Sequence, residues 1–194
     1  MQKTPVTIEQ WRTFLDRTRY NWKQIDKVAD LNTRKNNPIT YVSWQDANHF
    51  TTWLQDISGK NYSLATEAQW KKACRGCNGQ LYPLDKEYDW GEEFETYMKG
   101  TLPVGHSLKD ETPYGCLDIW QNVSEWCLDW FDSGDYFHDS SIKWVNPKGP
   151  TSGTKKVYRG GNPLSSGWPR CTYRGFARPE EYHAYKGFRI VLNL

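Results

Sequence analysis

The sequence predicts a single α+β domain, on the strength of three observations. Segments in the first half place apolar side chains at helical spacing behind a helix start signal. After residue 78, Gly, Pro, Asn and Asp interrupt the chain every few residues, which favours short strands and irregular loops. The 194 residues include 11 Trp, 12 Tyr and 7 Phe against a mean hydropathy of −0.86, so we expect an aromatic core.

Each expected helix starts with a hydroxyl residue followed three positions later by Gln or Asp, the capping-box pattern that satisfies free helical amides. The first helix starts at residues 7–10 and continues through Trp11 and Phe14. The second starts at residues 43–46 and ends at 58–59, where Gly follows Ser. A third and shorter helix starts at residues 66–69, and we expect it to end near Arg75 and Gly76.

Strand candidates are few and short. They cover residues 101–104, 157–159 and 188–192, and the last is expected to place Phe188, Ile190 and Leu192 on one face. Isolated tryptophans in the irregular half are interpreted as packing residues that hold the loops: Trp90, Trp126, Trp130 and Trp144.

The formal net charge of +2 gives no general electrostatic basis for binding nucleic acid, so we expect no nucleic-acid partner. No window approaches the run of about 18 apolar residues that membrane insertion requires. The start of the chain also lacks the apolar stretch of a signal peptide. We therefore expect a cytoplasmic or phage-associated protein that reaches a surface only through another route.

Five cysteines are an odd number, and without a secretory signal they do not imply a full disulfide framework. At least one thiol is expected to be free or paired between chains. Cys74 and Cys77 have zinc-like spacing, but no second pair follows, so we interpret them as residues at a helix end. Whether Cys127 and Cys171 approach each other is left open.

Several sequence blocks, taken in order, resemble the formylglycine-generating enzyme (sulfatase-modifying factor) family. The resemblance runs from about residue 4 to 192 and implies a variant C-type-lectin fold with two main helices, short antiparallel strands and much irregular loop. It implies one such domain over residues 1–194, without the family's usual N-terminal strand block, as in a shortened version of the fold or a truncated chain. The blocks are residues 38–47, 59–76, 89–91, 102–105, 113–118, 122–126, 158–161 and 187–189.

In the catalytic members that this chain resembles, two cysteines bind copper and oxidise a substrate cysteine. At the two matching positions this sequence has Ser165 and Arg170, and neither side chain can replace a thiolate as a Cu(I) ligand. Cys171 is adjacent to the second position but has no partner thiol there. The departure implies a protein that is not an enzyme, without catalytic residues or a copper cofactor.

The family's calcium ligands are only partly retained, as Asn122 and Glu125. Two interpretations stay open: these residues bind calcium, or they tie a buried loop through hydrogen bonds. We favour no metal and no resident cofactor.

The segment between residues 161 and 187 is rich in Tyr, Trp, Ser, Gly and Arg, a mixture typical of adaptable binding surfaces. It also resembles the variable segment of diversity-generating retroelement proteins, in which a fixed scaffold presents a hypervariable surface ending in Gly-Phe-Arg. The expected ligand-binding residues are Ser165, Ser166, Trp168, Arg170, Tyr173, Phe176, Glu181, Tyr182, His183 and Tyr185.

Three functional hypotheses follow. The first is a non-catalytic protein that binds a protein or cell-surface ligand through this segment. The second is a copper-dependent formylglycine-generating oxidase that acts on protein cysteine. The third is a structural or assembly component that uses the fold only for packing.

Overall fold

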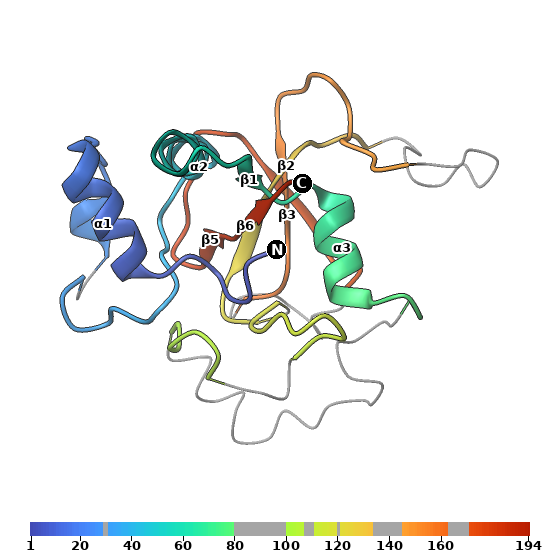
Figure 1. Cartoon of the computed structure of the whole chain (residues 1–194), viewed down its shortest axis with the longest axis horizontal. Helices are drawn as coiled ribbons and strands as arrows, with labels where there is room; N and C mark the ends of the chain where they lie inside the picture. The colour runs from blue at the N-terminus through green and yellow to red at the C-terminus, as the bar shows by residue number, and fades with distance from the viewer. Residues whose placement is uncertain (29–30, 80–99, 107–110, 120, 134–144, 163–170) are drawn as a thin grey trace.

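The computed structural model describes residues 1–28, 31–79, 100–106, 111–119, 121–133, 145–162 and 171–194. Within them, the helices flank a central group of short strands, and the two ends of the chain lie close together (Figure 1). The helices are α1 (Ile8–Thr18), α2 (Trp44–Ser58) and α3 (Glu67–Arg75), with a 3-10 turn at Ile25–Lys27. The strands are β1 (Tyr62–Leu64), β2 (Ser124–Trp130), β3 (Lys156–Arg159), β4 (Arg174–Ala177), β5 (Lys186–Phe188) and β6 (Ile190–Leu192).

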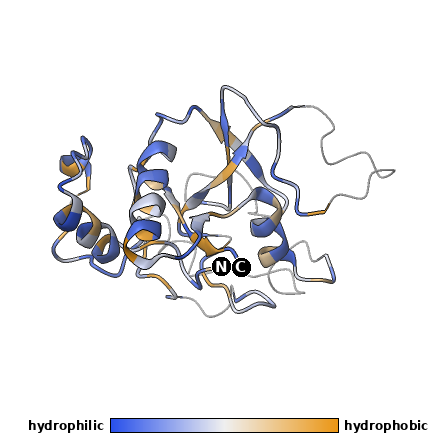
Figure 2. Ribbon diagram, turned by 45° about the horizontal axis from the view of Figure 1, so that its top comes forward, coloured by the Kyte–Doolittle hydropathy of each residue, from blue (hydrophilic) through white to orange (hydrophobic). Residues whose placement is uncertain are grey.

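All three capping boxes predicted from the sequence are present. Thr7, Ser43 and Thr66 each accept a hydrogen bond from the backbone N–H three residues on, and that residue's side chain bonds back. The second helix ends as expected at Gly59, which adopts the left-handed conformation. Hydrophilic and hydrophobic residues alternate along the helices, typical of amphipathic helices that bury one face (Figure 2).

The strands form two sheets. One is four-stranded, in the order β4-β3-β2-β5, and the other pairs β1 with β6. Within the larger sheet, β2 and β5 run parallel while the remaining neighbours are antiparallel. Helices α1 and α2 pack on one side of these strands and α3 packs on the other (Figure 1).

The expected aromatic core lies between α1, α2 and the sheet. Trp11 is fully buried at its centre, with its ring centroid 4.9 Å from that of Phe14 and 5.8 Å from that of Phe50. Phe188 brings β5 into the same cluster through an edge contact with Phe50. Such ring pairs add stability beyond their buried area, which explains how a chain of low mean hydropathy fills a core.

Two strand predictions are wrong. Residues 101–104 form no strand, because both backbone groups of Leu102 bond to the side chain of Asn122 instead of a neighbouring strand. Residues 188–192 are split at Arg189, so β5 joins the four-stranded sheet and β6 pairs with β1. The alternation therefore fails: Phe188 and Val191 are buried, whereas Leu192 is exposed.

Two of the four isolated tryptophans lie in the described part of the chain, and both pack as predicted. Trp126 is buried and its indole N–H donates to the carbonyl oxygen of Val42. Trp130 is partly buried and stacks on Trp44. Trp90 and Trp144 lie outside the described residues. None of the described helices has the length and apolar character to cross a bilayer.

Candidate ligand-binding surface

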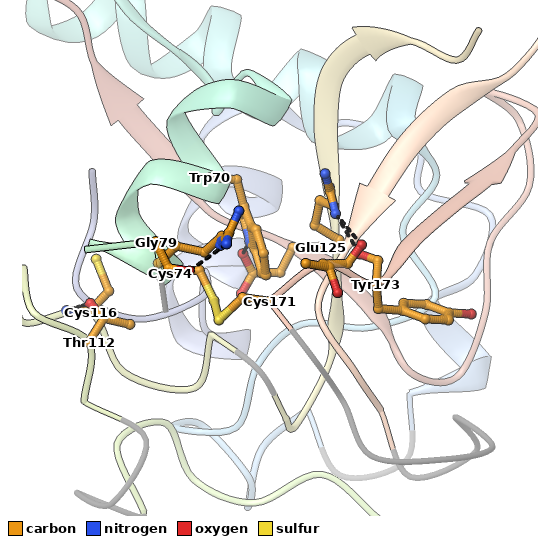
Figure 3. Close-up of a disulfide and its surroundings, with 11 residues drawn as sticks. Trp70, Cys74, Gly79, Thr112, Cys116, Glu125, Cys171 and Tyr173 are labelled. Carbon is orange, nitrogen blue, oxygen red and sulfur yellow. Dashed lines mark hydrogen bonds between the residues drawn. A yellow bond between two sulfur atoms is a disulfide. The ribbon is translucent and has the colours of Figure 1, made fainter. Parts of the chain in front are cut away.

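The C-terminal segment, residues 171–188, is fastened to the rest of the protein along its length. It starts at Cys171, which forms a disulfide with Cys74 at the end of α3, 97 positions earlier (Figure 3). It continues into β4, which pairs with β3, and ends in β5, which pairs with β2. Between these strands, the carbonyl oxygens of Pro179 and His183 accept hydrogen bonds from the backbone before and within α2.

This disulfide answers the open question about the cysteines. Cys171 pairs with Cys74 and not with Cys127, which is buried with a free thiol, while Cys77 and Cys116 are free as well. The expectation that at least one thiol is free or paired between chains is confirmed, because these three are free within the chain. Because the sulfur of Cys74 is committed to the disulfide, Cys74 and Cys77 do not form a zinc-binding pair.

A set of buried ion pairs lies beneath the sheet on the α3 side. Glu67, at the start of α3, is 2.7 Å from a guanidinium nitrogen of Arg159 and 2.7 Å from one of Arg174. Arg159 also donates to the backbone oxygens of Thr172 and Tyr173, directly before β4. This arrangement fixes the start of the candidate binding segment to the helix beneath it.

The second buried pair involves Glu125, one of the two weak calcium candidates. Both carboxylate oxygens of Glu125 accept hydrogen bonds from Arg189, at 2.7 Å each, and one also accepts from the indole of Trp70. The side-chain oxygen of Asn122 accepts from the backbone of Leu102. Because calcium would need these same oxygens as ligands, the donor set does not fit a calcium site and matches the alternative of a hydrogen-bonded buried loop. Together, Glu67, Glu125, Arg159, Arg174 and Arg189 are the ionic layer.

Four of the ten residues expected to bind ligand lie outside the described residues: Ser165, Ser166, Trp168 and Arg170. Two of these four, Ser165 and Arg170, are the positions that match the family's copper ligands. The other six are placed by the structure. Tyr173, Phe176 and Tyr182 are 42 to 44% exposed, which is high for aromatic side chains, and Glu181 and His183 are also exposed. Tyr185 is half-buried.

These six residues do not form one patch. Phe176 lies on the α3 side of the sheet, where its ring centroid is 4.0 Å from that of Phe131 and the ammonium of Lys155 covers it at 4.4 Å. Tyr182 lies near Tyr41, before α2. His183 and Tyr185 are neighbours, with 6.2 Å between their ring centroids.

A separate cluster forms around Tyr158 on β3 and Lys186 on β5. Burial raises the pKa of Tyr158, with smaller contributions from nearby Tyr173 and Glu181. Burial also lowers the pKa of Lys186 to about 8, an effect that Glu181 partly offsets. The pKa of His183 is lowered by burial and by the Lys186 cation. We call Tyr158, Tyr173, Glu181, His183 and Lys186 the tyrosine–lysine cluster.

Tyr158 and Lys186 were not among the residues expected to bind ligand. Tyr158 lies in the block 158–161, which matches the family's fixed positions, whereas Lys186 lies at the end of the candidate segment but is not among the ten residues expected to bind ligand. The ring of Tyr158 covers Gly175, where an added Cβ would come within 2.2 Å of it, so only glycine fits there. A Tyr opposite a Gly on a neighbouring strand leaves no signal in a single sequence, because the pairing depends on register.

Taken together, the short mixed sheets, the helices on both sides and the long irregular connections are those of a C-type-lectin-like fold. Its membership is then clear from sequence: the whole chain, residues 1–194, matches the Sulfatase-modifying factor enzyme 1-like domain, and the protein belongs to this family.

Two curated relatives and one solved structure illustrate the similarity. The chain is 32% identical over 186 residues to the formylglycine-generating enzyme of Thermomonospora curvata, covering 84% of this chain and 58% of the relative. It is 33% identical to the mouse formylglycine-generating enzyme, covering 88% and 48% respectively. It thus spans about half the length of these relatives. Treponema denticola variable protein 1 superimposes with a TM-score of 0.71 at 21% identity, covering 96% of this chain and 81% of that one.

Proposed function

We propose that this protein is a non-catalytic binding protein that presents the C-terminal segment to a protein or cell-surface ligand. The observation that carries the proposal is the contrast within this segment: its backbone is fastened at both ends, while Tyr173, Phe176 and Tyr182 stay more than 40% exposed. Exposed aromatic side chains on an ordered backbone lose little conformational entropy on binding. The similarity to a variable protein supports the proposal at the level of fold.

The copper-oxidase alternative is favoured by the identity to formylglycine-generating enzymes, at 32 and 33%. Against it stand Ser165 and Arg170 at the positions of the family's cysteine pair, and the disulfide that occupies Cys171. A sulfur in a disulfide is not a thiolate, so it is not a Cu(I) ligand until it is reduced.

An anaerobic Cu(I) titration, followed by oxygen uptake with a cysteine-containing peptide, separates these two functions. We expect neither stoichiometric copper binding nor turnover. Stoichiometric binding with turnover, both lost in Cys171→Ala, would establish the oxidase instead.

A random peptide library displayed on phage tests binding against a purely structural role. We expect the wild-type protein to enrich a consensus sequence that the Tyr173→Ala/Phe176→Ala/Tyr182→Ala variant does not enrich. A matched control variant replaces exposed aromatic and aliphatic residues elsewhere, Tyr114→Ala and Ile57→Ala, and should enrich the same consensus as wild type. Equal enrichment by all three proteins would contradict the proposed surface.

For location, we propose display outside the reducing cytoplasm through another export route or with a phage particle. The Cys74–Cys171 disulfide supports this over a cytoplasmic location, because glutathione and thioredoxin keep most cytosolic thiols reduced. We propose no nucleic-acid partner and no membrane insertion.

A further inference from the structure

Two lysines of this protein occupy similar surroundings, and the difference between them points to a ligand site. The ammonium of Lys186 lies between the rings of Trp126 and Tyr158, 4.4 and 4.3 Å from their centroids. The ammonium of Lys156 lies between those of Trp44 and Trp130, at 4.1 and 3.7 Å. Both residues are more than nine-tenths buried, at 8% and 4% exposed.

Their hydrogen bonds differ. Lys156 donates to the backbone oxygen of Leu128 at 2.8 Å, and Asp129 provides a nearby negative charge. In the part of the chain that the structure describes, Lys186 has no hydrogen-bond acceptor for its ammonium and no carboxylate within ion-pair distance. Ring faces attract a cation but accept its N–H groups only weakly. The Lys186 ammonium is not among the fully enclosed polar atoms of the described residues, so solvent reaches it and it can bind an acceptor from outside the described protein.

The side chains around Lys186 indicate where such an acceptor would bind and which charge it would carry. Tyr173, Glu181 and His183 interact with Tyr158 or Lys186 and are exposed, so Lys186 lies directly beneath the candidate binding surface. Among the described residues, Glu181 is the acidic group that acts on the pKa of Lys186, and it repels an incoming anion. Both this repulsion and the attraction by Lys186 double for a dianion such as phosphate, so charge alone does not choose the anion. The acidic groups of an unmodified protein ligand are carboxylates, which makes a carboxylate the expected anion.

We propose that Lys186 is the floor of a carboxylate-binding subsite, walled by Trp126 and Tyr158, that receives an acidic side chain or the C-terminal carboxylate of a protein ligand. This subsite deepens the proposed binding function and rests on it. A charge-assisted hydrogen bond from the ammonium to the carboxylate supplies the missing acceptor. The exposed tyrosines beside the subsite then contact the apolar parts of the ligand.

The test uses the intact protein with ¹³C-labelled lysine, in which the Cε–Hε signals of Lys186 and Lys156 are shifted by the rings that flank them. Signals are assigned with Lys186→Met and Lys156→Met. The probe is N-acetylglycine, which carries one carboxylate, and its neutral control is N-acetylglycinamide, both titrated at constant ionic strength. We expect the acid to shift the Lys186 signal with a dissociation constant of the order of 1 mM to 10 mM, typical of one isolated contact.

Three comparisons make this result specific. Lys156 should not respond, because its ammonium already has an acceptor, and the amide should move neither signal. The pKa of Lys186 should rise in the presence of the acid, because a bound anion favours the charged amine. Glu181→Gln, at an exposed position, should tighten binding of the acid several-fold and that of inorganic phosphate by a larger factor.

An unchanged Lys186 signal, or equal shifts of both lysines, would overturn the carboxylate subsite. Phosphate binding to the wild-type protein as tightly as N-acetylglycine would overturn the carboxylate selectivity. Peptide-library enrichment without any response of Lys186 leaves the proposed function standing and rejects the subsite alone. If a consensus is enriched, an Asp, a Glu or a free C-terminus in it identifies the source of the carboxylate.

Discussion

The side chains beneath the C-terminal segment and those above it differ in burial and in the interactions that they make. Beneath it, the charges of the ionic layer are joined by short hydrogen bonds, and all but the partly buried Arg174 are buried, as with Glu125 and Arg189, which are at most 1% exposed. Above it, Tyr173, Tyr182 and Glu181 are exposed, with few interactions within the chain. The buried contacts of the lower side therefore hold the backbone in place, and we expect substitutions on the upper side to affect stability less. This division is compatible with the binding function proposed above.

Breaking the ionic layer should have the largest effect. Arg189→Met leaves the Glu125 carboxylate buried with only the Trp70 indole as a partner, and it removes the donor to the backbone oxygen of Leu117. We expect a loss of about 3–5 kcal/mol in the free energy of unfolding, measured by urea denaturation. The exposed control Arg178→Met should change stability by less than about 0.5 kcal/mol. Equal effects would show that the ionic layer is not what holds the fold.

Removing the Cys74–Cys171 disulfide should have the second-largest effect on the free energy of unfolding. Cys74→Ala removes a crosslink across 97 positions, and we expect a loss of about 2–4 kcal/mol in the free energy of unfolding under oxidising conditions. The matched control is Cys77→Ala, an exposed free cysteine in the same short motif, which should leave stability unchanged. The difference between the two variants should disappear in a reducing buffer. A difference that persists there would mean that packing, and not the crosslink, causes the loss.

Two buried carboxyls of the scaffold make stability depend on pH. Burial raises the pKa of Asp118 and of Asp129 to about 6, whereas unfolding returns each to about 3.8. Between these values the native state binds more protons than the unfolded state, so these groups stabilise the protein as pH falls from 7 towards 4. We expect chemical denaturation to show this rise near pH 6.

Asn at both positions keeps the acceptor oxygen that binds the backbone N–H of Gly105 or Glu67, and it does not titrate. The Asp118→Asn/Asp129→Asn variant should therefore lose most of the rise in stability between pH 7 and pH 5. A slope equal to that of the wild type would assign the dependence to other groups.

The exposed side should tolerate change best. Tyr182→Ala removes a side chain that is 44% exposed and has a single ring neighbour, so we expect a stability change within about 0.5 kcal/mol. Thermal unfolding measures it, with the buried aromatic Phe188→Ala as the contrasting variant at about 3–5 kcal/mol. A large effect of Tyr182→Ala would mean that the surface is part of the scaffold.

The sequence predicted the local features well. The capping boxes at Thr7, Ser43 and Thr66 depend on contacts three residues apart, and the aromatic face of the first helix depends on spacing alone. Strand β3 was also predicted, but β2 was not. Its residues are almost all buried on both sides of the sheet, so it lacks the alternation that marks a strand with one exposed face.

The candidate site was only partly predictable. Composition and family resemblance directed attention to the segment that contains Tyr173, Glu181 and His183, and the structure places these three around one cluster. Lys186 and Tyr158 complete that cluster from strands on either side of β2. The spacing of residues in the sequence does not predict this cluster, because the cluster depends on the parallel pairing of β2 with β5.

The sequence by itself determined where the helices begin, that the core is aromatic, and which family the chain belongs to. Only the tertiary structure decided that Cys171 pairs with Cys74, that the last strand is split at Arg189, which binds Glu125, and that Lys186 lies between two rings with no acceptor among the described residues. The physical reason is distance along the chain. Helix caps are set by neighbours within four residues, whereas these contacts join residues tens of positions apart and depend on how the sheets pair.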